Sequence, residues 1–315
     1  MRFAIYGSGG VGGYFGARLA EAGEDVTFIA RGDHLAAILR DGLTVRSING
    51  DCHLAKAQAS DDPATIGVVD VVIVAVKAWQ VEEIARSMAP LIGPETLVLP
   101  LENGVEATEV LGEAVGHDKV LRGLCGILAW REAPGVIRHA GVEPFVRFGE
   151  ADNHKSERTQ RVKAAFDQAS GVTAEIPDDI QVAVWSKFLF ICAMSGVGAV
   201  TRAPMGVSRQ LPESRRLLEQ VMEEITAVGR ARGVALPDDA VTKALTFIDT
   251  LPATSTASMQ RDIMGGLPSE LESQNGAVVR LGQAAGVATP INAALYAALL
   301  PQEARARGQV AFDDR

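Results

Sequence analysis

Near its start the chain has a run of glycines of the kind that binds phosphate groups. The run fits the pattern G-x-G-x-x-G directly after a predicted strand and at the start of a predicted helix. In such a loop the first glycine allows the tight turn, the second lets the backbone approach a pyrophosphate, and the third lets the helix pack on the strand. The anion then lies against free N–H groups at the positive end of the helix. We expect the loop to bind a dinucleotide rather than to be a plain turn. Its residues are Gly7, Ser8, Gly9, Gly10, Val11 and Gly12.

A basic residue stands where the choice between the two nicotinamide dinucleotides is usually made. NAD-binding loops have an acidic residue about 20 positions after the glycines, which binds the ribose hydroxyls. This chain has Arg31 there. A guanidinium forms paired hydrogen bonds with a 2′-phosphate and cannot accept one from a 2′-hydroxyl. We therefore expect NADPH or NADP+ as the cofactor. The alternatives are that Arg31 is a surface arginine in water, or that nearby Asp33 permits both cofactors.

Strand-like and helical segments alternate in the first half, the pattern of a parallel sheet covered on both faces. Residues 71–76 are continuously apolar, as expected of a central strand buried on both sides. Between residues 136 and 148, short pieces broken by glycine and proline predict antiparallel strands at a sheet edge. The clearest strands are predicted over residues 3–6, 26–30, 69–76, 97–101 and 173–176, and a helix over 156–168.

From residue 178 onward the chain has helical periodicity almost throughout. At 315 residues it exceeds the roughly 250 to 300 residues that a single core usually covers. We therefore predict two domains, an α/β domain with a parallel sheet over residues 1–177 and an all-α domain over 178–315. The helices of the second domain are predicted over residues 181–199, 214–232, 237–250, 255–263, 269–285 and 290–304.

Composition and charge exclude several classes of protein. A formal net charge of −9 argues against binding to nucleic acid or to an anionic membrane. The apolar stretch over 188–200 is shorter than the roughly 20 residues that a membrane span needs. Neither the three cysteines nor the five histidines have metal-ligand spacing, so we expect no metal and a cytoplasmic protein. The long apolar helices are compatible with a homodimer.

Several segments besides the glycine loop form one pattern through both predicted domains. They are Ala30-Arg31-Gly32, Val76-Lys77-Ala78-Trp79-Gln80, Glu102-Asn103-Gly104, Trp185-Ser186-Lys187, Ser258-Met259-Gln260-Arg261-Asp262-Ile263 and Glu270. Together they resemble the ketopantoate (2-dehydropantoate) 2-reductase family. The resemblance implies a Rossmann domain joined to a helical domain, with NADPH and substrate between them. It also implies reduction of a 2-oxo acid to a 2-hydroxy acid, in pantothenate biosynthesis.

Lys77 and Asn103 each follow a predicted strand, at the carboxyl end where open α/β sheets bind ligands. From the residues alone, an ordinary loop is as good an interpretation of Lys77 and Asn103 as a binding site, since Asn-Gly is a common turn. The resemblance implies that Lys77 and Gln80 face the cofactor. It implies that Asn103 lies on the nicotinamide side and contacts the substrate as well.

Hydride transfer to a ketone leaves negative charge on the oxygen, so the site needs a proton donor. Lys187 is the candidate, because it lies in a strongly apolar helix where an ammonium is costly unless it faces a polar cleft. The alternative is a lysine that extends to water. The resemblance adds Glu270 as a catalytic carboxylate. Alternatively, Ser269 and Glu272 form a capping box with Glu270 as a first-turn acid.

Three further residues are expected at the substrate. Ser258 is expected to bind the substrate carboxylate, with Asp262 four residues later as support. Ile191 and Ser195 lie four and eight residues after Lys187 and share its helix face. Ketopantoate reductases typically have asparagines at these two places, and an isoleucine cannot hydrogen-bond a substrate hydroxyl. The sequence therefore predicts the family's chemistry on a 2-oxo acid other than ketopantoate.

Two other functions stay open. One is an opine-type or 3-hydroxyacid dehydrogenase, which also joins a dinucleotide-binding domain to a helical one. The other is a non-catalytic NADPH sensor. Arg31 and the spread of matching segments favour the 2-oxo acid reductase over the first, and the presence of both Lys187 and Glu270 argues against the second.

Overall fold

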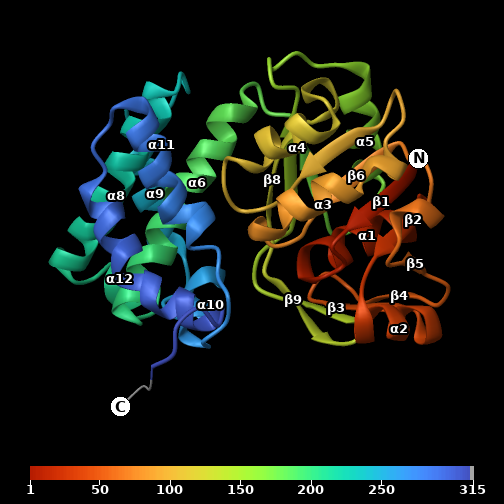
Figure 1. Ribbon diagram of the computed structural model, residues 1–315, viewed down its shortest axis with the longest axis horizontal. Helices are drawn as coiled ribbons and strands as arrows, with labels where there is room; N and C mark the ends of the chain where they lie inside the picture. Colours follow the sequence, from red (N-terminus) through yellow and green to blue (C-terminus); the bar gives the residue numbers. More distant parts are fainter. Residues whose placement is uncertain (313–315) are drawn as a thin grey trace. The chain divides into compact units, whose positions relative to one another are not determined.

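The computed structural model describes residues 1–312 and separates into two compact units (Figure 1). The first unit comprises residues 1–102 and 107–183, and the second comprises residues 103–106 and the chain from 184 onward. The division lies a few residues after the predicted boundary at 177/178. It also assigns the turn 103–106, with Asn103, to the second unit.

A five-stranded parallel sheet forms the centre of the first unit, with strand order β5-β2-β1-β6-β7. The chain runs from β1 outward to β2 and later continues at β6 on the other side of β1. The order therefore reverses between β1 and β6, and in such sheets ligands bind at the carboxyl ends of the strands at this point. The strands are β1 (Arg2–Tyr6), β2 (Asp25–Ile29), β5 (Gln58–Ser60), β6 (Val71–Val74) and β7 (Leu97–Pro100).

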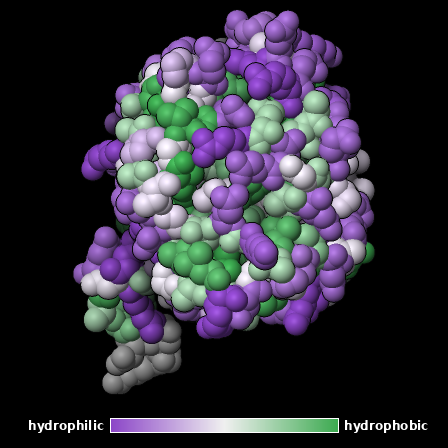
Figure 2. Space-filling model, turned by 90° about the vertical axis from the view of Figure 1, so that its right-hand side faces the viewer, coloured by the Kyte–Doolittle hydropathy of each residue, from purple (hydrophilic) through white to green (hydrophobic). Residues whose placement is uncertain are grey.

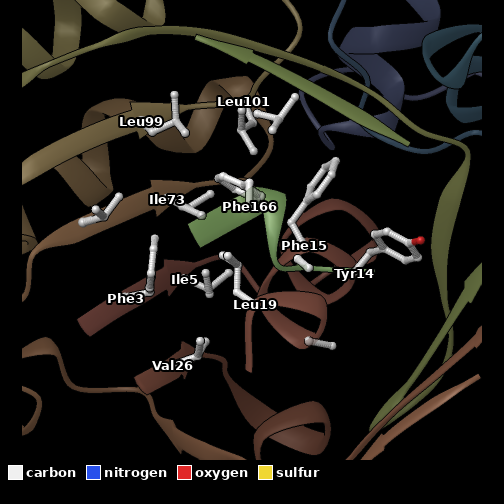
Figure 3. Close-up of a cluster of buried hydrophobic side chains, with 14 of the residues drawn as sticks. Phe3, Ile5, Tyr14, Phe15, Leu19, Val26, Ile73, Leu99, Leu101 and Phe166 are labelled. Atoms are coloured by element: carbon white, nitrogen blue, oxygen red, sulfur yellow. The ribbon is translucent and has the colours of Figure 1, made fainter. Parts of the chain in front are cut away.

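Apolar residues cover both faces of this sheet, because successive side chains of a strand point to opposite sides. Phe3 and Ile5 pack on one face with Phe15 of α1 and Phe166 of α5 (Figure 3). Ala4 and Tyr6, their neighbours in β1, belong to the cluster on the other face with residues of α3 and α4. The prediction of an α/β sheet covered on both sides is confirmed. The helices of the first unit are α1 (Gly10–Glu21), α2 (Gly32–Asp41), α3 (Val81–Ser87), α4 (Ala107–Val115) and α5 (Glu157–Asp167).

Strands β10 and β11, over the region 136–148, correct one prediction. Each lies inside a separate small sheet, β10 between β3 and β9, and β11 between β12 and β8. Each has one antiparallel and one parallel neighbour, so the antiparallel pairing is right and the edge position is wrong. The strands of these two sheets are β3 (Leu43–Ser47), β4 (Cys52–Leu54), β8 (Arg122–Gly126), β9 (Ala129–Ala133), β10 (Val136–His139), β11 (Phe145–Gly149) and β12 (Thr173–Glu175).

The second unit is helical, as predicted. Its long helix α6 is apolar enough to cross a membrane by length and composition, but 61% of the relevant window is buried in the protein. That burial is typical of a core helix. Leu271, Met259 and Leu299 form a cluster with the end of α6. The helices are α6 (Ile180–Thr201), α7 (Met205–Ser208), α8 (Pro212–Ala231), α9 (Ala240–Thr250), α10 (Ser258–Met264), α11 (Ala277–Ala285) and α12 (Pro290–Ala306).

The segment predicted as one helix over 269–285 begins differently. A π-helix, η5 (Glu272–Gly276), precedes α11, and the capping box that was the alternative for Ser269 and Glu272 is not formed, because the Ser269 N–H donates to Glu303. The Glu272 carboxylate instead accepts from the hydroxyl of Tyr296 at 2.6 Å and pairs with Arg280. Single π-turns of this kind often occur at functional sites.

The three cysteines are buried and form no disulfide among the described residues. Figure 2 shows hydrophobic residues in separate groups among more numerous hydrophilic ones on one face of the molecule. Such a mixture is ordinary for the exposed surface of a folded domain.

Candidate active site

The glycine loop joins β1 to α1 and is tightly packed on one side. Gly7 has φ +96°, and a Cβ there would lie 2.8 Å from the carbonyl oxygen of Ala75. A Cβ on Gly12 would lie 2.1 Å from the carbonyl oxygen of Gly7. At Gly9, by contrast, a Cβ would meet no atom within 4 Å. The loop therefore has open space at Gly9, where a pyrophosphate approaches the backbone of a dinucleotide-binding loop.

The amino end of α1 suits an anion. Gly9 is the N-cap, the helix has no acidic residue in its first turn, and the first N–H groups of a helix have no partner within it. Gly10 and Val11 are the first helical residues. The Ser8 side chain is buried, and its hydroxyl donates to the carbonyl of Ile29 at 3.4 Å. Ser8 can thus offer its backbone to a ligand, while its hydroxyl points inward.

Arg31 is the N-cap of α2 and has an exposed side chain. Both terminal nitrogens of its guanidinium donate to the Glu83 carboxylate on α3 at 3.3 Å. Asp33 is the residue whose carboxylate suggested NADH as an alternative to NADPH. It pairs with Arg131 of β9 at 3.2 Å. Arg31 is therefore held in an exposed ion pair, and the Asp33 carboxylate already has a cationic partner.

Lys77 and Gln80 lie in the turn after β6, at the point where the strand order reverses. The Gln80 side-chain oxygen accepts from the backbone N–H of Lys77 at 3.2 Å. The Lys77 ammonium lies over the Trp79 ring, 5.6 Å from its centroid. Gly7 packs against Ala75 and Val76 of the same segment. The glycine loop and the Lys77 turn are therefore neighbours, and Gln80 holds the backbone of that turn.

In the second unit the structure brings Asn103 to Glu270. The Asn103 amide donates to Oε2 of Glu270 at 3.3 Å. The Gln274 amide approaches the same oxygen at 3.4 Å, and the Glu270 side chain is only 5% exposed. A buried carboxylate needs such donors, since without them it loses the hydrogen bonds of water.

Helix α6 carries Lys187 and Ile191, both partly buried, and Ser195, which is fully buried. The Ser195 hydroxyl has no hydrogen-bond partner within the described part of the chain. Burial and then the Glu270 carboxylate raise the pKa of the Cys192 thiol on this helix, so that carboxylate lies close to α6. Glu270 and the helix of Lys187 are thus parts of one region of the second unit.

Two glycines of α6 let neighbouring segments approach it closely. A Cβ on Gly196 would lie 2.8 Å from the Asn275 side-chain oxygen of η5, and one on Gly198 would lie 2.5 Å from that of Gln260. Gln260 is on α10, whose first residue is the partly buried Ser258. Ser258 is therefore on a helix that packs against α6.

Some residues at these sites escaped the sequence analysis. Gln274 and Asn275 lie four and five residues after Glu270, and the Asn-Gly pair inside a helical pattern was the signal available. His34, three residues after Arg31, contacts the backbone of the glycine loop. The histidines have no metal-ligand spacing, and no motif in the sequence indicates that His34 contacts the glycine loop.

Comparison with known proteins agrees with this arrangement. Residues 3–153 match the family described as ketopantoate reductase PanE/ApbA, and residues 179–303 match its C-terminal domain. The uncharacterized oxidoreductase YkpB of Bacillus subtilis is 31% identical over 306 residues, covering 96% of this chain and 99% of that protein. A 2-dehydropantoate 2-reductase of Nostoc is 29% identical over 99% of this chain and 98% of the relative.

A solved structure shows the same fold. It is a PanE/ApbA family ketopantoate reductase from Ralstonia eutropha, with a TM-score of 0.88 and 32% identity over 98% of this chain and 100% of the other. The family matches cover both units, and the similarity runs along nearly the whole chain. The chain therefore belongs to the ketopantoate reductase family of oxidoreductases.

Proposed function

We propose that this protein uses NADPH to reduce a small 2-oxo acid to the 2-hydroxy acid. The glycine loop carries the proposal, because Gly7 and Gly12 leave no room for a side chain while the Cβ position of Gly9 is open, as a bound pyrophosphate requires. The reaction is supported by family relatives whose name, 2-dehydropantoate 2-reductase, describes the reduction of a 2-oxo acid.

The cofactor contacts follow from residue chemistry. Backbone N–H groups of residues 8–12 bind the pyrophosphate at the amino end of α1. Arg31 binds the 2′-phosphate in place of the Glu83 carboxylate, because a doubly charged phosphate is the stronger partner for a guanidinium. Lys77 contacts cofactor phosphate or ribose, while Gln80 maintains its turn. Asn103 contacts the nicotinamide side of the site.

Bound NADPH supplies a hydride to the carbonyl carbon of the substrate. Lys187 transfers a proton from Nζ to the carbonyl oxygen as negative charge develops there. Asn103 and Gln274 hold one oxygen of the Glu270 carboxylate, so this group keeps one orientation beside the substrate hydroxyl. The Ser258 hydroxyl binds the substrate carboxylate.

Substrate choice rests on the residues that follow Lys187 along α6. Ile191 is partly exposed and offers an apolar side chain, whereas Ser195 is fully buried. Ile191 is therefore the residue of the two that contacts the substrate tail. Each methylene buried against it contributes about 0.8 kcal/mol. We propose a 2-oxo acid with an alkyl or aryl tail as the preferred substrate.

A turnover screen tests the reaction. NADPH oxidation is measured with ketopantoate, straight and branched 2-oxo acids and an aryl 2-oxo acid, next to NADPH binding without substrate. We expect turnover with at least one 2-oxo acid. If NADPH binds but none of these acids is reduced, the reductase activity is rejected and the protein is a non-catalytic NADPH-binding protein. Absence of NADPH binding would reject the whole proposal.

Other predictions accompany this function. We infer that residues 1–177 form the cofactor domain and residues 178–315 the substrate domain. A cytoplasmic location, assembly as a homodimer and the absence of nucleic-acid, membrane and metal partners stay predictions from composition.

A further inference from the structure

His34 lies in the first turn of α2, and its imidazole is buried between two backbone segments. Its Nε2 atom is 2.7 Å from the carbonyl oxygen of Ser8 in the glycine loop. Its Nδ1 atom accepts a hydrogen bond from the backbone N–H of Gly135 at 3.0 Å. Gly135 precedes β10 and has φ +72°. One side chain therefore connects the glycine loop, α2 and the turn before β10.

These two contacts determine where the imidazole carries its proton. A carbonyl oxygen only accepts, so Nε2 must hold the hydrogen that is donated to Ser8. An amide N–H only donates, so Nδ1 must be unprotonated to accept from Gly135. The arrangement requires a neutral imidazole with its hydrogen on Nε2. A second proton on Nδ1 would face the Gly135 N–H and break that contact.

The bond to Ser8 also fixes the direction of the next N–H group. The carbonyl of Ser8 and the N–H of Gly9 belong to one peptide unit, which is trans and planar, so the two groups point in opposite directions. Since the carbonyl points at His34, the Gly9 N–H points away from His34. Gly9 is the N-cap of α1, where the Cβ position is open.

Two charged side chains face the imidazole. Asp33 comes from α2 and Arg131 from β9, and they pair with each other at 3.2 Å, so their effects on His34 oppose one another. Burial is the largest influence and lowers the pKa of His34 from 6.5. The neutral form that the two hydrogen bonds require is therefore also the form that burial favours.

We propose that His34 is a positioning residue for the pyrophosphate-binding loop, which as the neutral Nε2–H tautomer holds the Ser8–Gly9 peptide with its N–H directed at the cofactor. The proposal rests on the proposed dinucleotide binding. It makes NADPH affinity depend on the protonation of a residue that touches no part of the cofactor. Acidification should weaken binding, because doubly protonated His34 loses Gly135 and loosens the turn that holds it.

Two substitutions separate the contacts of His34. Asn ends near the Nδ1 position and can accept from Gly135, but it is too short to reach Ser8. Gln reaches the Nε2 position and can donate to Ser8. We expect His34→Asn, which loses Ser8, to raise the NADPH dissociation constant about tenfold. His34→Gln keeps Ser8 and loses only Gly135, as doubly protonated His34 does, so we expect it to raise the constant by about threefold. The matched control is His53→Gln, an exposed histidine of β4.

The pH dependence supplies a readout that a merely structural role would not give. As the pH falls below 6.5 toward the lowered pKa of His34, the NADPH dissociation constant of the unmutated protein should rise, and that of His34→Gln should rise much less, because Gln does not titrate. Cofactor fluorescence measures both constants, and thermal unfolding confirms that each variant is folded.

Ring nitrogen shifts of histidine-labelled protein test the tautomer without any substitution. A hydrogen on Nε2 is expected, and a hydrogen on Nδ1 would overturn the proposal even if the variants failed to fold. Unchanged NADPH affinity in folded His34→Asn would overturn it too. If the unmutated protein bound no NADPH, the proposed function would be rejected, and the positioning role with it. The ring shifts would still show whether the two hydrogen bonds exist.

Discussion

Ser269 donates both its backbone N–H and its hydroxyl to the buried carboxylate of Glu303 on α12, with the hydroxyl 2.5 Å from Oε2. Arg307 completes the arrangement, since it donates to Glu303 at 2.6 Å and to the carbonyl of Ser269 at 3.1 Å. The Ser269 hydroxyl also accepts from the N–H of Leu271 at 3.2 Å. Glu303 and Arg307, at the end of α12, thus hold the N–H, the hydroxyl and the carbonyl of Ser269, the residue directly before Glu270.

Glu303→Gln should destabilise the protein and lower turnover. The amide keeps the shape but loses one acceptor oxygen and the negative charge, so it cannot accept all the hydrogen bonds that Ser269 and Arg307 donate, and about 1 to 3 kcal/mol of unfolding free energy should be lost. Because Ser269 positions Glu270, kcat should fall more than KM rises. Denaturant unfolding and steady-state kinetics measure the two effects. The control Asp239→Asn removes an exposed i,i+4 pair with Lys243 and should change stability little. Equal effects of the two variants would show that Glu303 has no special role.

Lys187→Ala should lower kcat by about 100-fold or more, because the proton that we propose it supplies is needed mainly in the transition state. The NADPH dissociation constant should change little. Stopped-flow measurement of NADPH oxidation gives the rate of substrate reduction, and cofactor titration gives the NADPH dissociation constant. The control Lys243→Ala removes an exposed lysine of the same unit. Near-normal turnover of Lys187→Ala at saturating substrate would make this lysine structural.

Arg31→Ala should remove most of the preference for NADPH over NADH, since in the proposed cofactor site the guanidinium supplies the charge for the 2′-phosphate. Affinity for NADH should stay nearly constant. Titration of both cofactors tests this, with Arg86→Ala as the control, an exposed arginine that pairs with Glu82 on α3. Equal affinities of the unmutated protein for NADPH and NADH would contradict the role of Arg31.

Glu83→Gln should strengthen NADPH binding modestly. It removes the carboxylate that pairs with Arg31 and competes with the 2′-phosphate. The pair is exposed, so a gain of no more than about fivefold is expected. The same titrations with NADH supply the control, because NADH lacks the 2′-phosphate. A loss of NADPH affinity would show that Glu83 holds Arg31 in its binding position rather than competing for it.

Ile191→Asn should shift kcat/KM toward ketopantoate and away from 2-oxo acids with alkyl or aryl tails. The amide can hydrogen-bond the ketopantoate hydroxyl, which an isoleucine leaves without a partner. Ile191→Leu, which keeps an apolar side chain, is the control. Adding Ser195→Asn should help less, because Ser195 is fully buried and a larger side chain must displace its neighbours. If ketopantoate is already the best substrate of the unmutated enzyme, another residue binds its hydroxyl.

Local pattern was enough for four of the five strands of the central sheet, β1, β2, β6 and β7. The apolar run 71–76 predicted a central strand, and β6 is buried at every position. The glycine loop could be recognised because its residues are adjacent in the chain and fit one pattern between a strand and a helix. The longer helices of the second unit followed from periodicity to within a few residues, except that α11 begins at Ala277 after a π-helix, and the short α7 was not predicted. Short-range sterics and burial determine these strands, helices and the loop, so each can be predicted from a contiguous segment of sequence.

Pairings between distant segments could not be read in the same way. Strand-forming residues predicted β10 and β11, but only the folded chain decided that they lie in the middle of two separate sheets. Likewise Gln274 comes beside Glu270 because η5 is a π-helix, a geometry that the helical periodicity did not reveal.

The sequence by itself therefore determined the type of most main elements, the glycine loop and the candidate site residues. The tertiary structure decided which of them meet. Asn103 reaches Glu270 across 167 positions of sequence, Ser269 reaches Glu303 across 34, and His34 reaches Ser8 across 26. These contacts depend on the packing of whole helices and loops. Hydrogen-bonding capacity is a property of each residue type, whereas the choice of partner belongs to the fold.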